Sequence, residues 1–174
     1  MAERFLELPS KRASIIGPHG SGKSTLVASL VHEWNQVRPE TIVHQLRFST
    51  GLSASRSLNG SIDSWSQSSI LILDGYEQLN FWSRIKVAWT VRRRSIRILA
   101  TAHQHLSGFE TLWETSVSDS SSHWVIELLL GLSECPDALA QLLKSTEWEC
   151  SRSKHGQNLR ESLFDMYDWW QKRF

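Results

Sequence analysis

The chain has 174 residues, with 19 Lys and Arg against 18 Asp and Glu and a hydrophobic fraction of 40%. These values are typical of a single globular domain that buries a core, and they exclude a disordered chain and a strongly basic one. The near-neutral charge gives no indication of nucleic acid as a primary partner, although it leaves room for a local basic patch.

The N-terminal segment lacks the features of a targeting signal. It is charged, contains Pro9 and has no apolar middle. No apolar run approaches the roughly 20 residues needed to cross a bilayer, so we expect a cytoplasmic protein without a membrane segment. Cys135 and Cys150 form no CxxC pattern and are expected to be reduced thiols. Most of the nine tryptophans are expected in the core or in packing between elements, because Trp carries a large apolar area.

Residues 14–26 read SIIGPHGSGKSTL, a short apolar strand, a glycine-rich loop and the start of a helix. The glycines allow a tight turn whose amide N–H groups point inward at an anion, and the helix N-terminus faces the same anion. The pattern G-x-x-x-x-G-K-S/T resembles the Walker A motif of P-loop NTPases. The resemblance implies that Lys23 reaches the β- and γ-phosphates and that Ser24 ligates Mg²⁺. The expected nucleotide-binding residues are Gly17, Pro18, His19, Gly20, Ser21, Gly22, Lys23, Ser24 and Thr25.

Two further strands are expected at residues 41–48 and 69–75, with a loop rich in Ser and Gly between them. The second contains ILILD, four apolar residues followed by Asp74, which is typical of a parallel strand buried on both faces. Asp74 would emerge at the carboxyl end of the strand, where open α/β sheets bind ligands. This stretch resembles a Walker B motif and implies that Asp74 holds Mg²⁺; the alternative is an Asp that caps the next helix.

Glu77 is the only acid that closely follows Asp74. The sequence DGYEQ resembles the D-G-x-D/E-D/E form of NACHT and other STAND NTPases, within the additional-strand (ASCE) division, with Gln78 in place of the second acid. The resemblance makes Glu77 the candidate that positions the attacking water. The alternative is a Glu that is favoured by the dipole at a helix N-terminus.

The next elements are a helix after Glu77 and an apolar strand, IRILA, that ends in a polar tip. In AAA+ proteins a strand at this distance carries a residue called sensor 1, and by resemblance Thr101 fits best and His103 next. Such a residue would hydrogen-bond the attacking water or the γ-phosphate. An ordinary polar strand end is the alternative.

The C-terminal part is expected to hold a loop at 116–122, a fifth strand at 123–130 and a helix at 134–145. A last helix would carry Leu159, Leu163, Met166, Tyr167 and Trp170 along one face. Its start, GQNLRESL, resembles the sensor 2 segment G-N-V/I/L-R-E-L of bacterial enhancer-binding AAA+ proteins, with one residue inserted. The resemblance implies that Arg160 reaches the γ-phosphate, whereas the alternative is a solvated Arg on an amphipathic helix. It also implies that FLELP, ahead of the first strand, packs near the adenine.

Taken together, the motif order resembles P-loop NTPases of the AAA+/STAND type. It implies an α/β three-layer fold with a mostly parallel five-stranded sheet in the order 5-1-4-3-2. Residues 1–133 would form the nucleotide-binding core, and 134–174 a short lid-like helical segment of the same compact unit. The resemblance further implies an ATP hydrolase that acts as a motor or switch, with a protein partner or self-association. Lys23, Glu77, Thr101 and Arg160 would be catalytic, and Ser24 and Asp74 would bind Mg²⁺.

Two other functions remain open from the sequence. A small-molecule or nucleotide kinase would use an arginine-rich lid, but Arg92, Arg93, Arg94 and Arg97 lead directly into an apolar strand. These arginines would equally suit an intersubunit arginine finger, a phosphate-binding patch or a solvated basic face. A non-hydrolysing ATP-dependent interaction module is the third reading, because Gly75 stands where a second acid often follows Asp74. ATP rather than GTP rests on family likeness, since no N-K-x-D motif occurs.

Overall fold

The structure, a computed structural model, describes residues 1–47, 65–66, 69–131 and 141–171. The chain divides into two compact units. The first comprises Met1–Gly17 and Gly22–Glu114, and the second comprises Pro18–Ser21 and Thr115–Phe174. This division falls at residues 114 and 115, ahead of the boundary at 133 and 134 that the sequence suggested.

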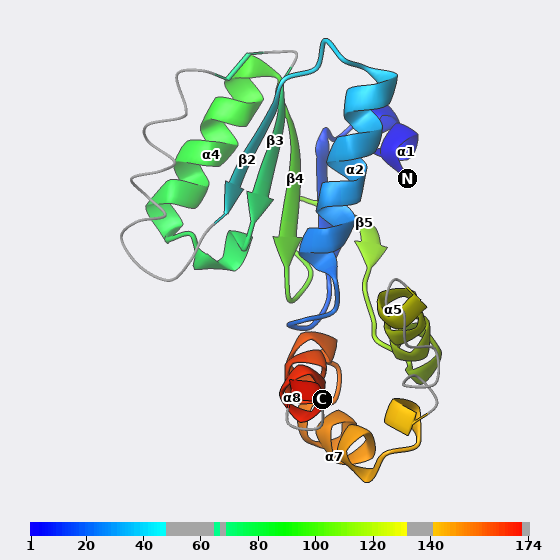
Figure 1. Ribbon diagram of the computed structural model, residues 1–174. Coiled ribbons are helices and arrows are strands. Elements are labelled where there is room, and N and C mark those ends of the chain that lie inside the picture. The colour runs from blue at the N-terminus through cyan, green and yellow to red at the C-terminus, as the bar shows by residue number, and fades with distance from the viewer. Residues whose placement is uncertain (48–64, 67–68, 132–140, 172–174) are drawn as a thin grey trace. The chain divides into compact units, whose positions relative to one another are not determined.

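A five-stranded parallel sheet is the centre of the first unit (Figure 1). Its strands are β1 (Arg12–Ile16), β2 (Val43–Arg47), β3 (Ile70–Asp74), β4 (Arg97–Ala102) and β5 (Glu110–Glu114). The strand order is β2-β3-β4-β1-β5, which confirms the predicted order. β1 and β3 both lie next to β4, so the carboxyl ends of the three strands come together at one edge.

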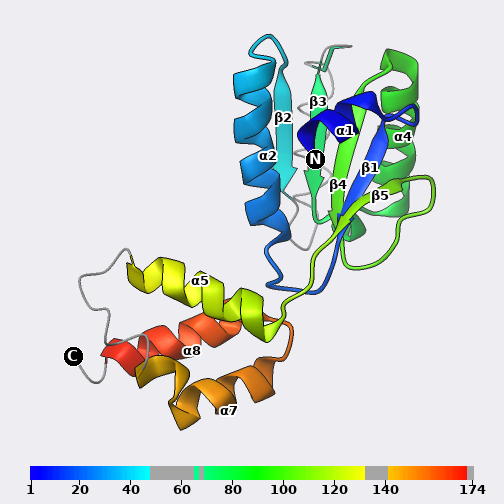
Figure 2. The ribbon, with the colours of Figure 1, turned by 90° about the vertical axis from the view of Figure 1, so that its right-hand side faces the viewer.

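Helices cover both faces of this sheet, as the two views in Figures 1 and 2 show. α1 (Ala2–Glu7) and α2 (Lys23–Val37) lie on one face, and α4 (Phe81–Arg94) lies on the other. In β3, Ile70 and Ile72 pack with the α2 side, whereas Leu71 and Leu73 pack with the α4 side. This alternation has the period of two that a strand imposes, and it confirms the predicted three layers.

The N-terminal helix α1 closes the core on the α2 side. Phe5 is 0% exposed, and its ring centroid lies 5.0 Å from that of Trp34. Trp34 in turn donates its indole N–H to the carbonyl of Ala2 at 3.3 Å. Phe5 is therefore a core residue with no exposed side-chain surface, and the expectation that the segment FLELP packs near an adenine stays a prediction.

The second unit contains α5 (Asp119–Gly131), α7 (Thr146–His155) and α8 (Leu159–Gln171). The expected fifth strand at 123–130 is wrong, because these residues belong to α5, and the expected loop at 116–122 is correspondingly shorter. Ser118 and Ser121 cap α5 reciprocally, each hydroxyl accepting a hydrogen bond from the other's backbone N–H at 2.9 and 3.1 Å. The fifth strand is β5, and α7 was not predicted.

The core of the second unit is small and largely apolar. It is formed by Val117, Ile126, Leu142, Trp148, Leu159 and Met166. Tyr167 was expected on this apolar face, but it is exposed, because the buried side of α8 runs through Leu159 and Met166. Most of the expected loop at 49–68, most of the expected helix at 134–145 and the side chain of Trp170 lie outside the described residues.

The tryptophans are less buried than their number suggested. Trp34, Trp65 and Trp148 are core residues, but Trp82, Trp89, Trp113 and Trp124 are exposed. The expectation that most of them lie in the core or in packing between elements is therefore wrong for the described part of the chain. No helix within that part is long and apolar enough to cross a membrane.

Candidate functional site

The glycine-rich loop joins the end of β1 to the start of α2, as the sequence predicted. Gly22 precedes the helix with φ 88°, and Gly20 has φ 68°, a left-handed conformation that favours glycine. The Lys23 ammonium folds back and donates to the carbonyl of Gly17 at 2.6 Å. β1 and α2 therefore flank the loop in sequence as predicted, and phosphate binding by the loop stays a prediction.

The electrostatics of Lys23 suit a phosphate ligand. Burial lowers the pKa of its ammonium below the usual value, because desolvation disfavours the charged form. The carboxylates of Glu77 and Asp74 act in the opposite direction and raise the pKa, but burial has the larger effect. A bound phosphate would add negative charge beside this partly desolvated cation and favour its protonated form.

Asp74 lies at the carboxyl end of β3 and accepts two short hydrogen bonds from hydroxyl groups. Ser24, in the first turn of α2, donates to Oδ2 at 2.9 Å, and Thr101, in β4, donates to Oδ1 at 2.6 Å. The Thr101 hydroxyl also accepts the backbone N–H of Gly75 at 2.9 Å. Thr101 thus orients Asp74 in this structure, and its expected contact with water or the γ-phosphate stays a prediction.

These oxygens fit a magnesium ion. Mg²⁺ prefers hard oxygen ligands and is usually held by one or two protein groups together with phosphate oxygens and water. The Ser24 hydroxyl and the Asp74 carboxylate already converge beside the phosphate loop. The side chain of Arg47 is more distant, with Nε 3.8 Å from Asp74 Oδ2.

Glu77 lies in a short 3-10 turn, Tyr76–Gln78, that follows Gly75. Its Oε1 is 2.9 Å from Nε2 of His103. Its Oε2 is buried and has no hydrogen-bond partner among the described residues. A buried carboxylate oxygen without a partner is costly, so this atom is suited to accept a hydrogen bond from a water or ligand that enters the site.

The ring of His103 connects Glu77 to the phosphate loop. Its Nδ1 lies 3.1 Å from the carbonyl of Gly17 and 3.4 Å from Nζ of Lys23. The sequence ranked this residue second to Thr101. Its position directly after the last residue of β4 could have revealed it, because residues at the carboxyl ends of parallel strands lie at the ligand-binding edge of such a sheet. Thr101 and His103 therefore contact different carboxylates: Thr101 donates a hydrogen bond to Asp74, and His103 pairs with Glu77.

The middle of the glycine-rich loop, residues 18–21, belongs to the second unit. Ser21 donates to the carbonyl of Pro18 at 2.8 Å and shares a 2.6 Å hydrogen bond with the Thr115 hydroxyl. Gly20 has the side chain of Asn158 against it, so that a Cβ at this position would overlap the amide. These contacts tie the tip of the loop to the segments that begin α5 and α8.

Arg160 also lies in the second unit, in the first turn of α8. The residue is exposed, and its guanidinium lies 5.4 Å from the ring centroid of Phe164, one helical turn further on. Its proposed contact with a γ-phosphate stays a prediction.

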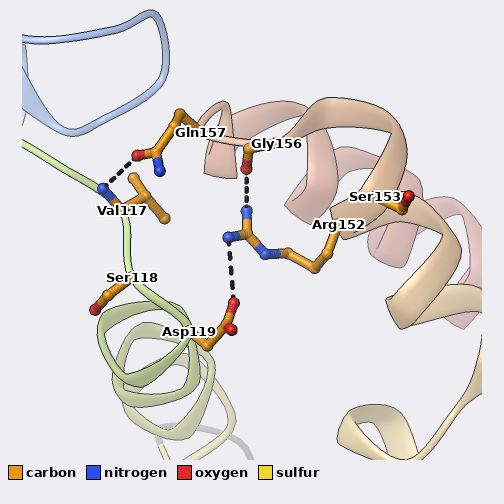
Figure 3. A pocket seen from close by; sticks show the side chains of 7 residues that line it. All are labelled: Val117, Ser118, Asp119, Arg152, Ser153, Gly156 and Gln157. Carbon is orange, nitrogen blue, oxygen red and sulfur yellow. Dashed lines mark hydrogen bonds and ion pairs between the residues drawn. The ribbon is translucent and has the colours of Figure 1, made fainter.

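The second unit contains a pocket (Figure 3). It is lined by Val117, Ser118, Asp119, Arg152, Ser153, Gly156 and Gln157. Its polar groups largely engage one another: Gln157 accepts the N–H of Val117 at 2.8 Å, and Arg152 donates to the carbonyl of Gly156 at 2.6 Å. Arg152 also lies 3.7 Å from Asp119. These contacts hold α5 and α7 together and bring no catalytic pair to the pocket.

No protein-family model matches the sequence, and neither does any curated protein. Solved structures do match in fold. The RuvB Holliday junction branch migration motor of Thermotoga maritima aligns with a TM-score of 0.55 and 14% identity over 90% of this chain. A point mutant of the same RuvB aligns with a TM-score of 0.58 and 13% identity, again over 90% of this chain.

The alignment shows a shared fold, and it covers only part of the RuvB chain. This chain spans 61% of the RuvB chain. RuvB is an AAA+ ATPase, and its α/β fold is the one built here from a parallel sheet in the order β2-β3-β4-β1-β5. The chain therefore has the α/β fold of AAA+ P-loop proteins.

Proposed function

We propose that this chain binds Mg-ATP and hydrolyses it, as a motor or switch module. One observation carries the proposal: the Glu77 carboxylate is held by His103 next to Lys23, and its second oxygen is buried and unpartnered among the described residues. The groups that we propose to bind phosphate and to position water therefore lie together in the first unit. The fold that this chain shares with RuvB supports the same function.

Nucleotide binding would use the loop and its lysine. The amide N–H groups of residues 17–25 and the N-terminus of α2 would contact the phosphates, and Lys23 would neutralise their charge. Ser24 and Asp74 would hold Mg²⁺, which on binding would offset charge on the β- and γ-phosphate oxygens. Thr101 would keep the Asp74 carboxylate in the orientation that the ion needs, through its 2.6 Å hydrogen bond.

Hydrolysis would use Glu77 as the group that orients water. The water oxygen attacks the γ-phosphorus, the bond from that phosphorus to the β–γ bridging oxygen breaks, and ADP, inorganic phosphate and a proton are released. Oε2 of Glu77 would accept a hydrogen bond from the water, while His103 holds Oε1. We also propose that residues 134–174 act as a lid-like segment in which Arg160 responds to the γ-phosphate.

The test is phosphate release from Mg-ATP by the full chain with no second substrate. Wild type is compared with Lys23→Ala and Glu77→Gln, and ATP binding is measured separately by calorimetry. We expect both variants to lose turnover and Glu77→Gln alone to keep ATP binding. Wild-type protein that binds ATP but releases no phosphate would refute the proposal that the chain hydrolyses ATP. GTP in place of ATP in the same assay tests the base preference.

A non-hydrolysing ATP-dependent interaction module is the second candidate. Gly75 follows Asp74 directly, and Glu77, whose charge acts on Lys23 together with that of Asp74, is already paired with His103. This function predicts ATP binding without turnover.

The kinase is less favoured, because it would need these arginines in a lid. Arg92, Arg93 and Arg94 instead form the last turn of α4, and Arg97 donates to the carbonyls of Phe5 and Leu8.

A further inference from the structure

Residues 75–79 connect the end of β3 to the start of α4 and carry Glu77, and we call this segment the Glu77 turn. Its centre is a single 3-10 turn. Within it, the backbone N–H groups of Gln78 and Leu79 donate to the carbonyls three residues earlier, at 2.9 and 3.1 Å. Hydrogen bonds of this type have poorer geometry than those of an α-helix, so they restrain the turn only weakly.

Arg84, near the start of α4, adds two stronger restraints to this turn. Its Nε donates to the carbonyl of Leu79 and its Nη2 to the carbonyl of Glu77, both at 2.9 Å. The guanidinium is planar and its N–H groups point in fixed directions. The two bonds together therefore fix both the distance and the orientation of the Glu77 turn relative to α4.

The guanidinium of Arg84 is itself held in place by the core. Its Cζ lies 5.3 Å from the ring centroid of Tyr76. Tyr76 is only 9% exposed, and its ring meets that of Phe109 edge to face at 5.2 Å. Val87 and Val91 anchor α4 in the same core. An aromatic ring beside the guanidinium favours one placement of the cation, so Arg84 is a fixed support for the turn.

The backbone and the carboxylate of Glu77 are held by different residues. Arg84 binds the backbone carbonyl, whereas His103 lies 2.9 Å from Oε1. The remaining oxygen, Oε2, is buried and has no hydrogen-bond partner among the described residues. Its location follows from the two restraints on the same residue. A misplacement of about 1 Å in a group that positions a reactant can lower a rate by about a hundredfold.

We infer, on the basis of the hydrolysis proposed above, that Arg84 is a positioning residue for Glu77. Its guanidinium fixes the backbone of the Glu77 turn and thereby places Oε2 where the attacking water is oriented. A merely structural arginine would contribute to the stability of the fold alone. A positioning arginine also sets kcat in the folded protein, without a matching effect on ATP affinity.

The test measures phosphate release from Mg-ATP and, separately, ATP binding by calorimetry, on the full chain. In Arg84→Gln we expect kcat to fall at least about tenfold while KM and the Kd of ATP change less than about twofold, because the phosphate loop is untouched. Arg84→Lys keeps the charge but offers a single ammonium in place of two nitrogens in a fixed plane. We expect it to recover little of the lost kcat.

Arg12→Gln is the matched control. Arg12 also binds a carbonyl of α4, because its Nη2 donates to Ala88 at 3.4 Å, and both arginines are half-buried. This variant removes an arginine from the same helix and leaves the Glu77 turn unchanged, so its kcat should equal that of wild type. Urea unfolding of every variant checks that the assayed protein is folded.

Amide hydrogen exchange gives a readout that needs no turnover. The N–H groups of Gln78 and Leu79 exchange when the turn opens. Without nucleotide, Arg84→Gln should speed exchange in a peptide that covers residues 75–80 by at least about fivefold, because the turn loses two hydrogen bonds. Arg12→Gln should exchange there like wild type.

Four results would overturn the inference. The first is exchange at wild-type rates in Arg84→Gln, and the second is an unchanged kcat in that variant. The third is a loss of kcat of the same size in Arg12→Gln, and the fourth is a wild-type kcat in Arg84→Lys, which would assign the effect to charge. Wild-type protein that binds ATP without turnover would refute the proposed hydrolysis, and the exchange rates would still decide whether Arg84 fixes the Glu77 turn.

Discussion

Replacing His103 by Ala tests the assignment of this residue as the group that positions Glu77. A hydrogen bond to a charged group contributes about 1.5–3 kcal/mol, and about 1.4 kcal/mol corresponds to a tenfold change in rate. The two side chains are 30% and 29% exposed, so solvent screening favours the lower end of that range. We therefore expect kcat for ATP hydrolysis to fall about tenfold, with a smaller change in KM. The assay is phosphate release at saturating Mg-ATP.

His105→Ala is the matched control, because His105 lies two residues further on and its ring Nδ1 is 3.0 Å from the Thr111 hydroxyl, away from Glu77. We expect it to hydrolyse ATP like wild type. His103→Gln should recover part of the rate, since an amide N–H can donate to Glu77 in place of Nε2. An unchanged kcat in His103→Ala, or an equal loss in His105→Ala, would refute the reasoning. A higher kcat would mean that His103 restrains Glu77 instead of positioning it.

Three further predictions concern stability. Thr101→Val should lower the free energy of unfolding by about 1–3 kcal/mol in urea titrations, because the Gly75 N–H and Asp74 lose a buried partner, whereas Thr101→Ser should not. Phe5→Ala should cost about 3–5 kcal/mol and leave the ATP affinity of the folded protein unchanged, as measured by denaturation and calorimetry. Hydrogen bonds from His155, and to a smaller extent from Ser151, lower the pKa of Asp165 in the folded protein. These bonds therefore stabilise the fold at pH values above the unfolded-state pKa of Asp165, and this stabilisation is lost as the pH falls through its folded-state pKa. Asp165→Asn should therefore flatten the acid side of the pH–stability profile.

The first half of the chain was predictable because its signals are local. A glycine-rich loop flanked by a strand and a helix, and a run of four apolar residues ending in Asp74, require particular backbone conformations and particular burial. The parallel strand order followed from family resemblance and is confirmed.

The last strand, β5, and the first helix of the second unit, α5, were harder to predict from the sequence. The run HWVIELLL is apolar enough for either a buried strand or a helix, and the cap that decides it is the reciprocal pair of Ser118 and Ser121. The sequence of β5 contains no apolar run, because β5 is an edge strand in which only Leu112 is buried. Burial depends on partners that are distant in sequence, so the exposure of Trp82 and Trp89 could not be read from their helical spacing.

The distribution of tryptophan gives the protein two separate optical signals. Indoles in a core emit at shorter wavelengths than indoles in water, so Trp34, Trp65 and Trp148 report the loss of packing. Trp82 and Trp89 are already hydrated, and unfolding changes their surroundings little. Any event that covers α4 would instead shift their emission to the blue while the fold stays intact. Emission spectra recorded against concentration and against denaturant would thus separate assembly from unfolding in an unlabelled sample.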